Sequence, residues 1–235
     1  MPVIKRPHTL YCIPYAGGTA SMIYSKWKKS CNDDLVIEPL ELKGRGARGR
    51  EDFYESIQEA ALDLSSSIHE NEFSLYAHSM GTLIAYELMF ALAKIGKKPV
   101  HLFLSGRYAP HIKSVKNFHI ANEQEFIHEI ERIGGTPRVV LENRELLNLF
   151  LPILKADYRI SECYQQTKSE HLFDCNIHYF FSNEDTLITL EQVKEWHTYT
   201  SGKMHIYNFN GGHFFIHEAY PEMLNIIKNI TTLHA

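Results

Sequence analysis

Short apolar runs alternate with helical patterns along most of the chain, and this alternation constrains the fold more than any other feature. Strands are expected at 9–13, 35–40, 73–76, 100–105, 175–181 and 203–209. Helices are expected over 20–29, 53–69, 82–95, 122–133, 142–164, 189–199 and 219–231. Strands that alternate with helices form a mostly parallel sheet covered on both faces. We therefore predict an α/β protein.

One helical block interrupts the alternation between the fourth and fifth expected strands. Two expected helices follow each other there, separated by Gly134-Gly135-Thr136-Pro137. Such an insertion is most simply a lid over the carboxyl ends of the strands, where ligands bind in α/β sheets. A chain of 235 residues fits one large domain. We predict a single domain over residues 1–235, with a lid insertion at about 109–165.

The stretch Ala77-His78-Ser79-Met80-Gly81 lies between an expected strand and a long expected helix. A serine on a sharp strand-to-helix turn, with small residues two positions before and after it, is the nucleophile-elbow pattern G-x-S-x-G. Ala77 stands where the first glycine is usual, and we expect the turn to accommodate its methyl group. The alternative is an ordinary serine cap on a buried helix. The catalytic interpretation makes Ser79 the nucleophile.

A serine nucleophile needs a histidine base and an acid that orients the histidine. Among 14 histidines, His213 stands out because it follows the last expected strand in a glycine-rich turn. The acid is expected after the preceding strand, where Glu184 and Asp185 are adjacent. We predict that Asp185 orients His213, with Glu184 as its competitor. The alternatives are that His213 is an ordinary surface-loop histidine and that Asp185 is an ordinary turn or cap residue.

Two backbone N–H groups are predicted to stabilise the oxyanion of an acyl-transfer reaction. The Met80 N–H lies at a helix start, where the first donors have no partner within the helix. The second donor should come from the loop after the first strand. That loop is Tyr15-Ala16-Gly17-Gly18, and we predict that the Ala16 N–H serves there. A plain turn is the alternative.

Other kinds of site are disfavoured by residue spacing. His213 and His217 are four positions apart, but the glutamate of the H-E-x-x-H pattern is absent between them. Neither a G-x-x-x-x-G-K-[ST] loop nor a strand followed by G-x-G-x-x-G is present. We therefore expect no metal and no cofactor. The loop 43–50 carries four cations in eight residues, and both phosphate contact and simple solvation remain open for it.

The net charge and the cysteines indicate which partners and which compartment to expect. The net charge is −4 and the isoelectric point is near 6.4, which argues against a nucleic-acid partner. Neither a signal peptide nor a membrane-spanning run is visible. The four cysteines form no C-x-x-C pair and are expected to be reduced, mostly buried thiols. We expect a cytoplasmic monomer that does not bind membranes.

With these residues placed, the chain resembles the free-standing type II thioesterases of nonribosomal peptide and polyketide synthesis, which belong to the α/β-hydrolase superfamily. The matching segments in the first half are Pro14-Tyr15-Ala16-Gly17-Gly18, Gly44-Arg45-Gly46-Ala47-Arg48, Ala77-His78-Ser79-Met80-Gly81, and Ser105-Gly106 with Ala109-Pro110. The later ones are Leu151-Pro152, Ala156-Asp157-Tyr158-Arg159, Glu162, Tyr164, Asp185, Trp196 and Gly211-Gly212-His213-Phe214-Phe215. One departure besides Ala77 is Lys43, which replaces the usual proline before Gly-Arg-Gly.

The resemblance implies the α/β-hydrolase fold and a substrate class that the residues alone do not give. Such enzymes hydrolyse acyl groups from the phosphopantetheine arm of carrier proteins, and so remove mis-primed or stalled intermediates. Carrier proteins are usually acidic around the arm, and Lys26, Lys28, Lys29 and the loop 43–50 either complement that charge or are ordinary solvated groups. The alternatives are a small-molecule esterase, an acyltransferase, or a catalytically silent carrier-binding protein on the same fold.

Overall fold

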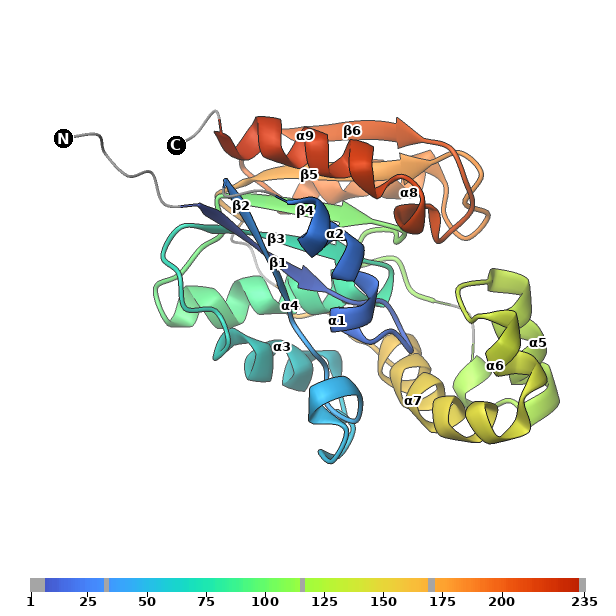
Figure 1. The fold of residues 1–235 in the computed structure, drawn as a ribbon. Coiled ribbons are helices and arrows are strands. Elements are labelled where there is room, and N and C mark those ends of the chain that lie inside the picture. The colour runs from blue at the N-terminus through green and yellow to red at the C-terminus, as the bar shows by residue number, and fades with distance from the viewer. Residues whose placement is uncertain (1–6, 32–33, 115–116, 169–171, 233–235) are drawn as a thin grey trace.

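The computed structural model describes residues 7–31, 34–114, 117–168 and 172–232, and a six-stranded sheet forms its centre (Figure 1). The strands are β1 (His8–Ile13), β2 (Leu35–Pro39), β3 (Phe73–His78), β4 (His101–Ser105), β5 (Asn176–Ser182) and β6 (Met204–Phe209). Their order across the sheet is β2-β1-β3-β4-β5-β6, and every neighbouring pair is parallel. The predicted parallel α/β architecture is confirmed, and the strands all end at the same edge of the sheet.

Helices cover both faces of this sheet. The α-helices are α1 (Ala20–Ile23), α2 (Ser25–Ser30), α3 (Ile57–Ser65), α4 (Met80–Lys94), α5 (Glu123–Ile133), α6 (Arg138–Glu142), α7 (Arg144–Glu162), α8 (Leu190–Lys194) and α9 (Tyr220–Thr232). Short 3-10 helices are η1 (Gly46–Arg48), η2 (Phe118–Ile120), η3 (Glu195–Tyr199) and η4 (Phe215–His217). Figure 1 shows α3 and α4 on one face and α2 and α9 on the other.

The side chains of β1 illustrate how the two layers form. Tyr11 and Ile13 join the apolar cluster that includes α3, α4 and η3, whereas Leu10 and Cys12 join the cluster that includes α1, α2 and α9. This division follows from the period of two along a strand. The next strand in the sheet, β3, has all six residues buried, as expected for a central parallel strand covered on both faces. The element that carries the elbow is therefore held firmly in the core.

Several helix boundaries differ from those expected. The expected helix 20–29 is divided at Tyr24, which ends α1 and precedes α2. The expected helix 53–69 is shorter because the Ser56 side chain accepts the Glu59 N–H and caps α3. At α8, by contrast, Thr189 and Gln192 form the capping box that their spacing indicates.

The helical insertion between β4 and β5 contains η2, α5, α6 and α7. The short helix α6 was not expected; it begins directly after Pro137, a residue compatible with a helix start. The insertion has an apolar cluster of its own, formed by Phe126, Ile130, Leu147, Leu151 and Leu154. Figure 1 shows α5 and α6 beside the sheet rather than on either of its faces. The insertion therefore packs partly as a separate unit.

Candidate active site

Ser79 lies on a sharp turn between β3 and α4. Its φ of 54° and ψ of −121° make it the one non-glycine residue with positive φ in the described part of the chain. Such a conformation costs free energy and persists only where neighbouring groups enforce it. The Ser79 N–H donates to the Ser105 carbonyl at 2.9 Å, and the Thr82 hydroxyl donates to the Ser79 carbonyl at 2.8 Å. The predicted strand–turn–helix context of the elbow is thus present.

The small residues flanking Ser79 allow the close packing of this turn. A Cβ atom on Gly81 would lie 2.7 Å from the Pro14 carbonyl oxygen and 2.9 Å from that of Ile13. Glycine is therefore required where α4 begins beside the end of β1. Ala77 is fully buried and pairs in register with Ile13 and Leu104. Its methyl group fits within the strand, so the departure from the usual glycine leaves the elbow intact.

Three side chains from separate loops form one hydrogen-bonded chain. His213 Nδ1 donates to Asp185 Oδ2 at 2.8 Å, and the Ser79 hydroxyl donates to His213 Nε2 at 3.0 Å. Ser79 follows β3, Asp185 follows β5 and His213 follows β6, so all three lie at the carboxyl edge of the sheet. The structure therefore brings together the three residues that the sequence analysis selected. This geometry is what a serine nucleophile and its base require.

Asp185, rather than Glu184, is the carboxylate beside His213. Asp185 is 3% exposed, and its second oxygen accepts the Leu187 N–H at 3.0 Å. Both carboxylate oxygens therefore have a donor, which fixes the orientation of the group. The Glu184 side chain is exposed, while its backbone N–H donates to the Ser182 hydroxyl at 3.2 Å. The turn after β5 thus directs one carboxylate inward and the other to solvent.

The two predicted oxyanion donors belong to neighbouring segments. Met80 is the first residue of α4, and Ala16 lies in a turn closed by a 3.0 Å hydrogen bond from the Gly18 N–H to the Tyr15 carbonyl. These segments meet at the contact between Gly81 and the Pro14 carbonyl described above. The arrangement suits donors that converge beside Ser79, and the catalytic role of the two N–H groups remains a prediction.

His78 is a site residue that the sequence analysis did not single out. It is fully buried, its Nδ1 hydrogen-bonds with the Ser105 hydroxyl at 2.9 Å, and its ring centroid lies 5.0 Å from that of His213. Burial, and then the nearby His213 and His217, hold the pKa of His78 well below its usual value. His78 is therefore neutral near pH 7 and adds no positive charge beside His213. The feature of the sequence that could have pointed to His78 is its position directly before Ser79.

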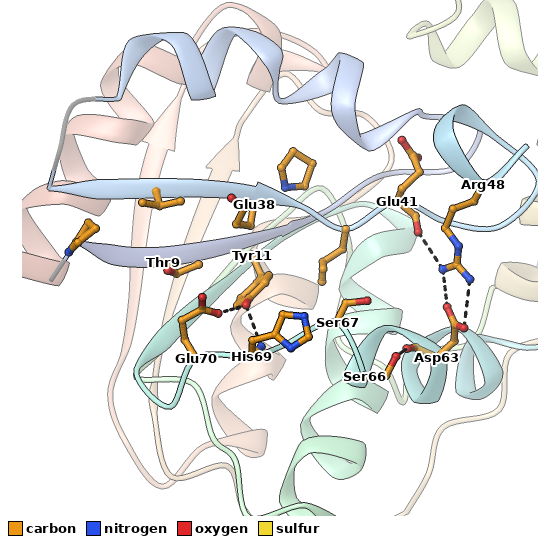
Figure 2. A pocket seen from close by; sticks show the side chains of 14 residues that line it. Thr9, Tyr11, Glu38, Glu41, Arg48, Asp63, Ser66, Ser67, His69 and Glu70 are labelled. Atoms are coloured by element: carbon orange, nitrogen blue, oxygen red, sulfur yellow. Dashed lines mark hydrogen bonds and ion pairs between the residues drawn. The ribbon is translucent and has the colours of Figure 1, made fainter.

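A hollow of about 690 Å³ lies along β1, β2 and the end of α3, and its lining includes none of the three residues of the hydrogen-bonded chain (Figure 2). Four of its polar lining residues form two pairs. Arg48 donates to Asp63, and the Tyr11 hydroxyl donates to Glu70. These internal pairs satisfy charged groups that would otherwise be available to a ligand, so the triad geometry, rather than this hollow, defines the candidate site.

Over residues 8–231 the sequence matches the family described as thioesterase domain. The chain belongs to this family. Gramicidin S biosynthesis protein GrsT of Aneurinibacillus migulanus is 34% identical over 223 residues, covering 93% of this chain and 86% of that protein. The medium-chain S-acyl fatty acid synthase thioesterase of Rattus norvegicus is 33% identical over 229 residues, covering 94% of this chain and 85% of that protein.

A solved structure is similar to this thioesterase over nearly its whole length. The crystal structure of ClbQ, from the colibactin nonribosomal peptide and polyketide pathway, has a TM-score of 0.91 and 31% sequence identity. The similarity covers 97% of this chain and 98% of ClbQ. The predicted resemblance to type II thioesterases and the α/β-hydrolase fold are therefore confirmed.

Three further expectations concern features outside the triad. In the described ranges of this thioesterase, no helix is long and apolar enough to cross a membrane, and no group of three or more His, Cys, Asp or Glu side chains is arranged to hold a metal. His217 instead hydrogen-bonds with the Tyr15 hydroxyl at 3.0 Å. The cysteines are free thiols, but only Cys12 and Cys175 are buried, so the expectation of mostly buried thiols holds for half of them.

Proposed function

We propose that this protein hydrolyses acyl groups from the phosphopantetheine arm of carrier proteins and thereby removes mis-primed or stalled intermediates from a nonribosomal peptide or polyketide synthase. The observation that carries the proposal is the hydrogen-bonded chain from Asp185 through His213 to Ser79, in a member of the thioesterase family. The similarity to GrsT and ClbQ, whose names place them in biosynthesis of this kind, supports the substrate class.

The proposed mechanism uses one acyl-enzyme intermediate. Ser79 Oγ attacks the thioester carbonyl carbon while His213 Nε2 takes the hydroxyl proton. The tetrahedral oxyanion accepts hydrogen bonds from the Ala16 and Met80 N–H groups. The carbon–sulfur bond then breaks, and His213 returns the proton to the departing thiolate. Water then attacks the acyl-Ser79 ester while His213 takes its proton. The bond between the acyl carbon and Ser79 Oγ breaks, His213 returns the proton to Oγ, and the carboxylic acid leaves.

Each of these steps is assigned to groups of the chain itself. Asp185 holds the Nδ1–H tautomer of His213, so that Nε2 is free to accept the Ser79 proton. The proposal therefore includes neither a metal nor a resident cofactor, since the phosphopantetheine arrives on the carrier protein. We propose that the enzyme acts as a monomer on a carrier domain presented by its synthase.

Carrier docking is proposed to involve the exposed lysines of α2. Lys26, Lys28 and Lys29 are all exposed, and Lys28 has a distant pairing with Glu38 at 3.6 Å. The loop 43–50 offers less free charge than its composition indicates. Arg45 is buried against Asp157, and Arg48 donates to Glu51 and Asp63. Lys43 has a distant pairing with Glu59 at 3.6 Å, so three of the four cations of this loop have a carboxylate partner within the protein.

The substrate class is tested by comparing thioesters and esters that carry the same acyl group. An acyl-carrier thioester, an acyl-pantetheine thioester and a small oxyester are supplied, and kcat/KM is measured for each by release of thiol or alcohol. We expect the carrier thioester to exceed the oxyester by about tenfold or more, because contacts to the remote carrier lower the barrier at the reacting carbonyl. A preference for the oxyester would indicate a small-molecule esterase.

The same set of substrates also distinguishes hydrolysis from acyl transfer and from binding without chemistry. Acyl transfer to an added amine or alcohol in place of water would indicate an acyltransferase. Carrier binding without turnover would indicate a catalytically silent binding protein.

We propose that α5, α6 and the start of α7 form a lid whose movement admits the acyl chain. Support comes from the joint between α5 and α6, where Gly134 and Gly135 have φ values of 83° and 85°. A Cβ atom on Gly135 would lie 2.3 Å from the ring of Phe214, whereas one on Gly134 would lie 3.9 Å from it. Phe214 directly follows His213, so this joint touches the catalytic loop.

This contact predicts different effects for two neighbouring substitutions. Gly135→Ala is expected to lower kcat/KM for a carrier thioester by about tenfold or more, because displacement of Phe214 disturbs the position of His213. Gly134→Ala strains the same joint without that clash and should have the smaller effect. Steady-state kinetics of both variants check the prediction. Equal losses would argue that stiffening of the joint, rather than contact with Phe214, controls the reaction.

A further inference from the structure

A buried ion pair joins α7 to the loops that follow β1 and β2. Arg45 Nη1 and Nη2 donate to Asp157 Oδ2 and Oδ1 at 2.5 and 2.7 Å. The two residues are 4% and 2% exposed. Asp157 Oδ2 also accepts the Gly17 N–H at 2.7 Å. The Asp157 carboxylate thus connects α7 to two loops, the one that contains Arg45 and the one that contains Ala16.

A second contact packs α7 against the loop that contains Gly17. Gly17 has a φ of 77°, and a Cβ atom at this position would lie 2.3 Å from Leu154 Cδ2. Leu154 and Asp157 are three positions apart and therefore lie on one face of the helix. This face fixes Gly17 by an apolar contact and a charge-assisted hydrogen bond. On the other side of the loop, the Tyr15 hydroxyl hydrogen-bonds with His217.

We propose that Asp157 is a positioning residue that holds Gly17, and through it the preceding Ala16 N–H, in the geometry that the oxyanion requires. This inference rests on the proposed function. Arg45 orients the Asp157 carboxylate by two parallel hydrogen bonds, and Gly17 accepts the backbone conformation that brings its N–H to that carboxylate. The position of α7 is therefore coupled to the oxyanion loop, and this part of the insertion stays fixed when the lid moves.

The energetics of buried ion pairs favour a positioning role over a purely stabilising one. Replacing such a pair by apolar residues of similar volume is often neutral for stability, whereas removal of one partner leaves an unpaired buried charge. Stability alone thus gives little reason for an Arg–Asp pair here. What distinguishes this pair is that Asp157 Oδ2 accepts the N–H of Gly17, which directly follows Ala16.

The first test compares conservative changes in two carboxylates of α7, the buried Asp157 and the half-buried Glu162. Asp157→Asn removes the charged acceptor of Gly17. Glu162→Gln is the matched control, because Glu162 accepts the Phe118 and His119 N–H groups at 3.1 and 3.0 Å and does not contact Gly17. For Asp157→Asn we expect a kcat loss of about 10- to 100-fold with KM nearly unchanged, less than the ~10²–10³-fold cost of removing an oxyanion donor.

Two further measurements identify the cause of that loss. Phosphonylation of Ser79 by a small phosphonate, which also places an oxygen in the oxyanion site, should slow by a similar factor. Amide hydrogen exchange of the peptide that contains Gly17 should accelerate in Asp157→Asn and not in Glu162→Gln. A kcat within about threefold of wild type for Asp157→Asn, or equal losses in the two variants, would overturn the inference.

The double variant Arg45→Met, Asp157→Leu covers the case in which Asp157→Asn does not fold. It replaces the pair by apolar residues, so it should fold, and it still lacks the acceptor for Gly17. We expect the same slow kcat and faster exchange at Gly17, and wild-type kcat would overturn the inference. If Ser79-directed phosphonates do not label the wild-type protein, the proposed function is rejected. The hydrogen-exchange measurement would still decide whether Asp157 holds Gly17.

Discussion

Replacing Ser79 with alanine is expected to lower kcat by about 10⁶-fold, since loss of the nucleophile from a comparable triad costs about that much. The variant removes the hydroxyl that donates to His213 Nε2 at 3.0 Å. The fold should remain, because the turn at Ser79 is held by its backbone N–H and carbonyl. Release of the carrier thiol from an acyl-carrier substrate measures the loss.

Ser66→Ala provides the control for this prediction. Ser66 is an exposed serine at the end of α3, and its hydroxyl donates only to the local Asp63 carbonyl. Its substitution should leave kcat unchanged. Thioesterase activity of Ser79→Ala within tenfold of wild type would show that another residue accepts the acyl group.

Replacing Asp185 with asparagine is expected to lower kcat by about 10⁴-fold, because the amide favours the wrong imidazole tautomer. In the structure, the Asp185 carboxylate accepts the Nδ1–H of His213 at 2.8 Å. With asparagine there, Nε2 tends to carry the proton and is unable to accept one from Ser79. Steady-state kinetics with the acyl-carrier thioester, at equal concentrations of folded enzyme, measure the effect.

The neighbouring carboxylate offers a matched comparison. Glu184→Gln alters an exposed side chain and leaves the backbone N–H of this residue on Ser182, so its kcat should change by less than about threefold. Equally small losses for Asp185→Asn and Glu184→Gln would mean that neither group orients His213. A larger loss for Glu184→Gln would reverse the assignment.

The hydrogen-bonded chain from Asp185 to Ser79 was predictable because each of its residues stands at a defined place relative to a strand. Ser79 follows the third strand in a recognisable elbow, and Asp185 and His213 follow the fifth and sixth strands. Parallel strands bring such loops to one edge of the sheet, so residues far apart in the chain become neighbours without any further signal. We predicted Asp185 over Glu184, but the conformation of the turn, which decides the side chain that faces His213, has no signal in the sequence.

The connection from Asp157 to Arg45 and Gly17 had no comparable signal in the sequence. These residues are separated by 112 and 140 positions, and neither hydrophobic periodicity nor a turn pattern links them. Similarly, the break of the first helix at Tyr24 follows from tertiary contacts, since its hydroxyl donates to the Ile13 carbonyl at 2.7 Å. Local propensity predicts which segments form helices and strands, but not the polar contacts between distant segments.

The acyl-enzyme mechanism requires Ser79 to carry the acyl group during hydrolysis of carrier-bound thioesters. It is tested most directly by rapid acid quenching of the enzyme with an acyl-carrier thioester, followed by mass spectrometry of its peptides. We expect the peptide that contains Ser79 to gain the mass of the acyl group transiently, while the carrier returns to its free-thiol mass. Ser79→Ala should show no such gain. Deacylation of the carrier with the acyl group attached to a different enzyme residue would contradict this mechanism.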